Sequence, residues 1–325
     1  MIIDFEHHYT PHVLWKRRGG QAGQTVRVFS SDGRPVRSIY DALHDIQLKL
    51  EHMDIAGIDM AVLTGSADNM EEAKVFNESC AKVVEQYPNR FIGFASTLPL
   101  EGKKALDELE RAVKSLGLKG VMVSVQSAKR PLDSRDLWPF YEKVCELHIP
   151  IFVHVSQAVE GFDACKAPYD LNRSLAREFE LMLDTTKICL GGVLEDFPDL
   201  KFIIAHFGGG ISSIKERLER YVGYWGAKFW NDKPLIREPF AERFNEHFSK
   251  IYFDMAGREI GMDTIKCALT NISPRRLVFA TDYPVNFVND PIGMKTYIEK
   301  IKTFDLGKET IDAMLGKNSI ELLGL

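Results

Sequence analysis

The sequence predicts a single (β/α)8 (TIM) barrel domain over residues 1–325. Eight short β-rich runs alternate with helical patterns, and no linker with a shift in composition divides the chain. Barrels with insertions often exceed about 250 residues as one domain, so this chain is long enough for one. The count of eight strands favours a closed barrel over a doubly wound open sheet, which stays the alternative fold.

Runs that are rich in apolar, β-branched and aromatic residues mark the predicted strands. In chain order they are residues 2–6, 60–64, 91–96, 120–124, 151–154, 202–206, 251–254 and 277–282. Several of them are nearly continuous apolar runs, which is typical of strands that are buried on both faces. We therefore expect parallel strands that are joined by helical crossovers.

Apolar residues at spacings of three and four predict helices between these strands. The clearest patterns cover residues 43–53, 105–116, 137–147, 214–221 and 311–315. Two polar stretches, residues 12–40 and about 155–172, follow the first and fifth strands. We expect both to be insertions on the C-terminal face of the barrel, where barrel enzymes place their active sites.

The composition excludes several classes of partner. The chain carries 41 basic and 46 acidic residues, a net charge of −5, without a basic stripe that would bind nucleic acid or an anionic membrane. Its start lacks the pattern of a signal peptide, and no apolar run approaches the about 20 residues of a membrane span. The five scattered cysteines include no C-x-x-C pair, so we expect reduced, mostly buried thiols in a cytoplasmic protein.

Side chains that bind metal ions stand at the ends of three predicted strands. Glu6 and His8 end the first strand, His154 the fifth and Asp282 the eighth. Residues two apart on a strand point the same way, so Glu6 and His8 face the barrel axis together, whereas His7 points outward as a packed or surface histidine. Two imidazoles and two carboxylates suit one divalent ion, Zn²⁺ or Mn²⁺, and leave an open position for water or substrate.

His206 ends the sixth predicted strand and opens the sequence His-Phe-Gly-Gly-Gly. One interpretation is a strand that ends in a glycine turn before a helix. The other is an acid or base next to the site, with glycines that let the backbone come close to a substrate. Asp254 ends the seventh strand, where it either orients a ligand or accepts a structural hydrogen bond.

Three arginines are candidates for binding an acidic substrate. Arg217 lies in the helix after His206, and its charged neighbours favour a solvated helix face. Arg34 and Arg37 belong to the first insertion, and solvated loop arginines are the better interpretation of both.

Five segments of the sequence carry a resemblance that covers essentially the whole chain. They are residues 3–11 (IDFEHHYTP), 53–59 (MDIAGID), 192–209 (GVLEDFPDLK followed by HFGG), 281–284 (TDYP) and 318–325 (NSIELLGL). Together they resemble the amidohydrolase-related family typified by aminocarboxymuconate semialdehyde decarboxylase and γ-resorcylate decarboxylase. Each segment alone is a weak signal, and the combination is specific.

The resemblance implies functional roles for individual residues. It implies that the metal ligands are Glu6, His8, His154 and Asp282, and that His206 is the catalytic histidine. It also implies that Arg217 reaches the active site of a partner subunit, and therefore a homodimer or a higher homo-oligomer. Glu6 resembles the hydroxybenzoate branch, because aminocarboxymuconate semialdehyde decarboxylase has histidine there. Gly209 departs from γ-resorcylate decarboxylase, which has glutamate at that position.

These features lead to the hypothesis of a metal-dependent, non-oxidative decarboxylase of a hydroxybenzoate-like aromatic acid or a related unsaturated acid. The metal ion would hold the substrate, Asp282 would donate a proton to the carbon that bears the carboxylate, and His206 would assist. Arg217 would neutralise the charge of the substrate. The alternatives are a metal-dependent hydrolase or hydratase of a lactone or related small acid, and a metal-binding barrel without turnover. The sequence leaves the substrate and the choice between zinc and manganese open.

Overall fold

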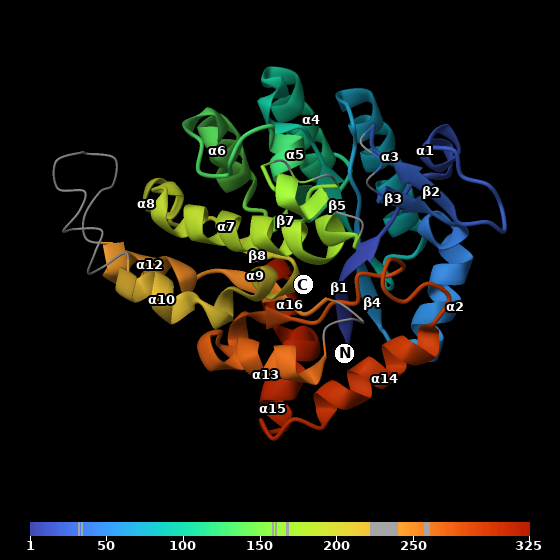
Figure 1. The fold of residues 1–325 in the computed structure, drawn as a ribbon. Helices are drawn as coiled ribbons and strands as arrows, with labels where there is room; N and C mark the ends of the chain where they lie inside the picture. Colours follow the sequence, from blue (N-terminus) through green and yellow to red (C-terminus); the bar gives the residue numbers. More distant parts are fainter. Residues whose placement is uncertain are drawn as a thin grey trace.

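The computed structural model describes residues 1–31, 33, 35–157, 159, 161–166, 169–221, 240–256 and 261–325. Eight parallel strands follow one another in chain order around a nearly closed barrel, and helices surround them (Figure 1). The strands are β1 (Ile3–His8), β4 (Met60–Thr64), β5 (Phe91–Ser96), β6 (Gly120–Val123), β7 (Ile151–Val153), β8 (Phe202–Ile204), β9 (Tyr252–Asp254) and β10 (Leu277–Val278). The predicted (β/α)8 barrel is confirmed.

The helices vary widely in length. The α-helices are α1 (His12–Arg17), α2 (Ile46–Ala56), α3 (Met70–Gln86), α4 (Lys103–Lys114), α5 (Val125–Ala128), α6 (Trp138–Leu147), α7 (Arg177–Leu190), α8 (Val193–Asp196), α9 (His206–Gly210), α10 (Lys215–Arg220), α12 (Phe240–Phe248), α13 (Met262–Asn271), α14 (Pro291–Lys302), α15 (Lys308–Asp312) and α16 (Asn318–Leu323). Short 3-10 or π turns are η1 (Asp41–Leu43), η2 (Pro99–Glu101), η3 (Arg135–Leu137), η4 (Asp163–Lys166), η5 (Asn172–Ala176), η6 (Ile211–Ser213), η8 (Pro274–Arg276) and η9 (Ala313–Lys317). None of the described helices is long and apolar enough to cross a membrane.

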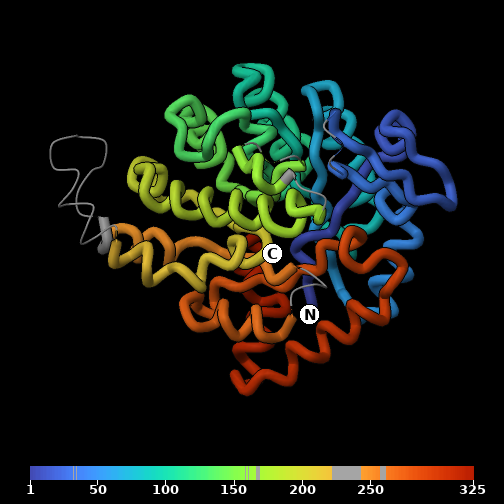
Figure 2. Tube along the Cα trace, viewed as in Figure 1, coloured from blue at the N-terminus to red at the C-terminus, as the bar shows by residue number. Residues whose placement is uncertain are grey.

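The first and last strands meet along a seam that is held by few backbone contacts. The Phe5 amide donates a hydrogen bond of 2.8 Å to the Phe279 carbonyl, and residues 7 and 283 form a parallel bridge. Asp4 reinforces the seam because its carboxylate accepts hydrogen bonds from the Thr281 amide at 2.8 Å and the Thr281 hydroxyl at 2.5 Å. The chain therefore runs once around the barrel before its ends become neighbours (Figure 2).

Aromatic rings fill the inside of the barrel. Phe5 makes edge-to-face contacts with Phe94 and Phe152, at centroid distances of 5.5 and 5.8 Å. These residues come from β1, β5 and β7, which are alternate strands, as in a layer of inward-pointing barrel residues. All three side chains are fully buried. The barrel is thus a packed core, and the polar residues that follow these rings lie at its C-terminal end.

Both predicted insertions lie at the C-terminal end of the barrel, and the first has regular structure. Residues 12–40 form α1 and then an antiparallel hairpin, β2 (Val26–Phe29) and β3 (Pro35–Ile39). In the second insertion, η4 and η5 precede α7. Residues of both insertions line the main cavity, as described below.

Candidate active site

The structure brings the four predicted metal ligands together at the C-terminal ends of β1, β7 and β10. One possible ligand atom from each of Glu6, His8, His154 and Asp282 lies within 4.8 Å of the others. His8 Nε2 is 2.8 Å from Asp282 Oδ1, and His154 Nε2 is 2.8 Å from Glu6 Oε1. All four side chains are buried or nearly so. This grouping is a candidate site for one divalent cation.

The ligand atoms of Glu6 lack the hydrogen-bond partners that they would need without a bound cation, and His154 lies beside them. The Nδ1–H of His154 donates to the Val155 carbonyl at 3.1 Å, which leaves the Nε2 lone pair facing Glu6. Burial, and then the neighbouring imidazoles of His8 and His206, lower the pKa of His154 well below its usual value, which favours its neutral form. Both oxygens of Glu6 are buried without a hydrogen-bond partner, and burial raises the pKa of Glu6 well above its usual value. Electron-rich atoms in this arrangement are satisfied by a metal ion.

His7 points away from the site, as the sequence predicts. Its ring is fully buried and stacks on Tyr283 at a centroid distance of 4.5 Å. Its Nδ1–H donates to Asp4 at 2.9 Å, across a shift of strand register between residues 4 and 7. His7 therefore packs the seam of the barrel.

His206 stands beside the four ligands and is held from two sides. Its Nε2 is buried without a hydrogen-bond partner, 3.8 Å from Glu6 Oε2. Its Nδ1–H donates to Glu178 at 2.9 Å, and its backbone amide donates to Asp254 at 2.8 Å. Burial alone lowers the pKa of His206, but the carboxylates of Glu178, Asp282 and Asp254 outweigh burial and raise it to about 10. The raised pKa favours the imidazolium form of His206, and Asp254 supports its backbone.

The glycines after His206 are required by a left-handed turn. Residues 206–210 all have positive φ, between 52° and 80°. A Cβ at position 209 would lie 1.9 Å from the Glu178 carbonyl oxygen. The close approach that the sequence suggested is thus an approach to α7, not to a substrate. A side chain as large as glutamate does not fit at Gly209 in this arrangement.

Gly209→Ala is expected to destabilise the protein more than Gly210→Ala. Position 210 has φ +80° and open space within 4 Å of the point where a Cβ would lie, so alanine there meets only the cost of a left-handed conformation, about 1–2 kcal/mol. At position 209 the collision with α7 adds about 1–3 kcal/mol. Denaturant unfolding of the two variants measures the difference. Equal losses would contradict the close packing of α7 on this turn.

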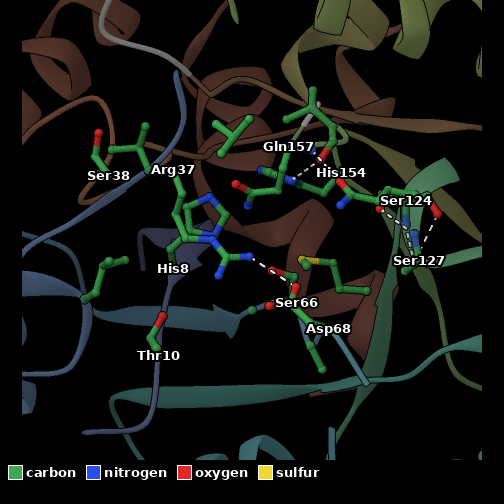
Figure 3. A pocket seen from close by; sticks show the side chains of 18 of the residues that line it. His8, Thr10, Arg37, Ser38, Ser66, Asp68, Ser124, Ser127, His154 and Gln157 are labelled. Atoms are coloured by element: carbon green, nitrogen blue, oxygen red, sulfur yellow. Dashed lines mark hydrogen bonds and ion pairs between the residues drawn. The ribbon is translucent and has the colours of Figure 1, made fainter. Parts of the chain in front are cut away.

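A cavity of about 530 Å³ opens next to the four ligands, and both insertions line it (Figure 3). Arg37 of β3 lines it and contacts Asp68 at 3.2 Å, with its side chain only 20% exposed. The interpretation of Arg37 as a solvated loop residue is therefore wrong, because the hairpin folds over the mouth of the barrel. Arg34 lies outside the described residues. Arg173 and Arg177 also line the cavity, and sequence reasoning named neither them nor Glu178.

Arg217 lies elsewhere. It belongs to α10, is exposed, has its guanidinium 5.9 Å from the centre of the Tyr221 ring, and is not among the residues that line this cavity. Its predicted role concerns the site of a partner subunit, so a single chain does not test it.

Comparisons with known proteins agree with the fold and show the family. A family model described as amidohydrolase matches residues 3–325. The chain belongs to the amidohydrolase family. This amidohydrolase is 27% identical over 308 residues to the 2-amino-3-carboxymuconate-6-semialdehyde decarboxylase of Dictyostelium discoideum, covering 90% of this chain and 80% of that protein. It is also 27% identical to the γ-resorcylate decarboxylase of Polaromonas, covering 74% of this chain and 78% of that protein.

A solved structure with the same fold was determined with a metal ion. It is a 5-carboxyvanillate decarboxylase from Novosphingobium aromaticivorans, complexed with manganese and 4-hydroxy-3-methoxy-5-nitrobenzoic acid. Its TM-score to this amidohydrolase is 0.78 at 19% identity, covering 100% of this chain and 96% of that one. The resemblance to this family that the sequence indicated is confirmed.

Proposed function

We propose that this member of the amidohydrolase family is a metal-dependent, non-oxidative decarboxylase of a hydroxylated aromatic acid or a related unsaturated carboxylic acid. The observation that carries the proposal is the position of the His206 imidazole beside a buried set of metal donors. Both oxygens of Glu6 are without a hydrogen-bond partner, His154 Nε2 lies 2.8 Å from one of them, and His206 lies 3.8 Å from Glu6 with its own Nε2 unpartnered. Such a site places positive charge and a transferable proton at one end of a cavity.

The residues that would hold the metal ion are Glu6, His8, His154 and Asp282. Two carboxylates balance the charge of a divalent ion, and this donor set accepts zinc or manganese. We favour manganese because the metal complex of the related decarboxylase contains it. When it is bound, the ion supplies positive charge that withdraws electrons from a substrate oxygen.

Two residues are candidates for delivering the proton. Asp282 shares its carboxylate between His8, at 2.8 Å, and the Asn286 amide, which donates to it at 2.8 Å. His206 instead carries a proton that Glu178 stabilises, and its Nε2 has no competing partner. We therefore assign the delivery of the proton to His206, and charge balance and metal binding to Asp282, which reverses the emphasis of the sequence-based hypothesis.

The residues of this chain account for the proton and the electron pair of the decarboxylation. The His206 imidazolium gives its Nε2 proton to the ring carbon that bears the carboxylate, and aromaticity is lost for a moment. The carbon–carbon bond then breaks, its electron pair restores the ring, and carbon dioxide leaves. A proton from solvent returns His206 to the imidazolium state, which the Glu178 carboxylate stabilises.

The defining experiment measures carbon dioxide release with and without metal. We expect protein that is freed of metal by chelation to lose turnover of its best hydroxybenzoate substrate, and added Mn²⁺ or Zn²⁺ to restore it. Carbon dioxide should form in a 1:1 ratio with the decarboxylated phenol. Activity that survives complete removal of metal would contradict the mechanism. Turnover of lactones or hydration of unsaturated acids, without carbon dioxide, would identify the hydrolase or hydratase alternative.

The proposed assembly is a homodimer or higher homo-oligomer in which Arg217 of one subunit enters the site of another. The exposed position of Arg217, outside the cavity of its own chain, is what this arrangement requires. The proposed location is the cytoplasm. The five cysteines are free, and Cys80, Cys165 and Cys189 are buried, as a reducing compartment allows.

A further inference from the structure

Arg177 occupies an unusual position in the cavity wall. It is the first residue of α7 and lines the cavity together with His154, His206 and Asp282. Next along the chain is Glu178, the carboxylate that contacts His206. The start of α7 therefore borders the reacting end of the cavity.

Each of the other described cations in the cavity wall has a carboxylate partner. Arg18 contacts Glu72 at 2.6 Å, Arg37 contacts Asp68 at 3.2 Å and Lys129 contacts Glu101 at 3.3 Å. Arg173 pairs closely with Asp170. Within the described part of the chain, no ion pair joins Arg177 to a carboxylate within 4 Å. Arg177 is thus the lining cation whose charge is left without a direct counter-ion.

The hydrogen bonds of Arg177 leave part of its guanidinium available. Its Nη2 donates to the carbonyls of Gln157, at 2.8 Å, and Val36, at 3.3 Å. Its Nε is buried and has no hydrogen-bond partner among the described residues. Guanidinium stays charged at any physiological pH, so this group places a positive charge at the cavity wall, beside a buried donor without a partner. An anionic group of a bound molecule balances such a charge.

We propose that Arg177 binds the carboxylate of the substrate, so that the enzyme selects ionised acids through a residue of its own chain. This inference rests on the proposed function, because it assigns the cavity to an acid substrate. It differs from the predicted role of Arg217, which needs a second subunit. It also defines the ligand class as a planar acid with a carboxylate next to the metal donors.

The chemistry predicts which kinetic constant Arg177 affects. In the proposed mechanism the ring carbon is protonated before carbon dioxide leaves, so the carboxylate keeps its charge in that step, and a cation beside it stabilises the bound acid and the transition state about equally. Loss of Arg177 should therefore raise KM by about 10- to 100-fold, the range that 1.5–3 kcal/mol from a charged hydrogen bond gives, while kcat changes by less than about threefold. A purely structural role would lower kcat and stability as well.

The test compares two ligands of nearly the same shape, of which only one carries a negative charge. Manganese-loaded protein is titrated calorimetrically with salicylate and with salicylamide, in which an uncharged amide replaces the carboxylate. We expect Arg177→Gln to weaken salicylate binding by about 10- to 100-fold and salicylamide binding by less than about threefold. Arg177→Lys keeps the charge and should retain most of the salicylate affinity. Arg173→Gln is the matched control, because Arg173 lines the same cavity but already pairs with Asp170.

The outcomes separate this inference from the proposed function. Equal losses for both ligands, unchanged salicylate binding in Arg177→Gln, or a wild-type protein that does not bind salicylate would each overturn the role of Arg177. Charge-selective loss in a protein that releases no carbon dioxide from any acid would support the role of Arg177 and reject the decarboxylase. If Arg177→Gln does not fold, Arg177→Met, which keeps an extended side chain without the charge, takes its place in the comparison of the two ligands, with the same expected losses.

Discussion

Replacement of His206 by alanine is expected to lower kcat for carbon dioxide release by about 10²–10⁴-fold, the contribution of a positioned proton-transfer group. The imidazolium is held by Glu178 at 2.9 Å, and no other described histidine combines an unpartnered Nε2 with such a carboxylate in this cavity. Metal content should stay near that of the wild type, because His206 is not among the four grouped ligands. Steady-state kinetics and elemental analysis of the same preparation measure both quantities.

His247→Gln is the control for loss of a buried histidine. His247 bonds to the Cys189 carbonyl at 2.8 Å and does not line the cavity, so its replacement should leave kcat unchanged. A loss below about tenfold in His206→Ala would remove His206 from the mechanism.

The His206→Ala variant also tests whether Arg217 of one subunit acts in the site of another. If Arg217 acts across an interface, mixing inactive His206→Ala and Arg217→Ala subunits creates an intact site and restores activity, whereas sites within one subunit would stay inactive.

Replacement of Glu6 by glutamine is expected to abolish turnover by loss of the metal ion. An amide keeps the size of the side chain but removes the negative charge and brings an N–H group towards His154. Mutation of a residue that only hydrogen-bonds to a metal ligand typically lowers metal affinity by about 10- to 100-fold. Loss of a charged ligand itself should therefore lower metal affinity by more than about 100-fold. Titration of metal-free protein with Mn²⁺ measures the affinity directly.

Glu72→Gln is the matched carboxylate control for this variant. Glu72 lies near the cavity and pairs with Arg18 at 2.6 Å, but it is outside the group of possible ligands. Metal affinity in Glu72→Gln should match the wild type. Wild-type affinity in Glu6→Gln would show that Glu6 is not a ligand, and the donor set would then be reduced to two histidines and Asp282.

The strands were predictable because strands that are buried on both faces appear in the sequence as runs of consecutive apolar residues. The predicted bounds of β4 and β5 agree with the structure, since β5 is buried throughout and β4 is buried except for its first residue, Met60, which is partly buried. The eighth strand was predicted too long, to residue 282, whereas β10 ends at Val278. After it, the Phe279 amide turns to the Met314 carbonyl and Thr281 bonds to the side chain of Asp4. Those partners lie far away in the sequence.

Helix α7 shows why part of the site was missed. Its buried face includes the polar residues Glu180, Asp184 and Thr185, which interrupt the apolar spacing that marks a helix. Glu180 accepts a hydrogen bond from the Ser156 amide at 2.8 Å, so its burial depends on the second insertion. The roles of Arg177 and Glu178 follow from how α7 packs on the left-handed turn, and no local pattern encodes that packing. Glu6, His8, His154 and His206 were predictable because strand ends of a barrel converge by topology.

The seam between β1 and β10 has a consequence for how the protein assembles. Asp4 and Thr281, which join across it, are 277 residues apart in sequence, and the candidate ligands Glu6 and Asp282 flank the same joint. During synthesis, the donor set remains incomplete until almost the whole chain has emerged. A metal ion that binds only the complete donor set stabilises the closed barrel by mass action. Removal of the metal ion should therefore weaken the barrel first at the seam between β1 and β10. Amide exchange along β1 should therefore report metal occupancy before any change in the helices.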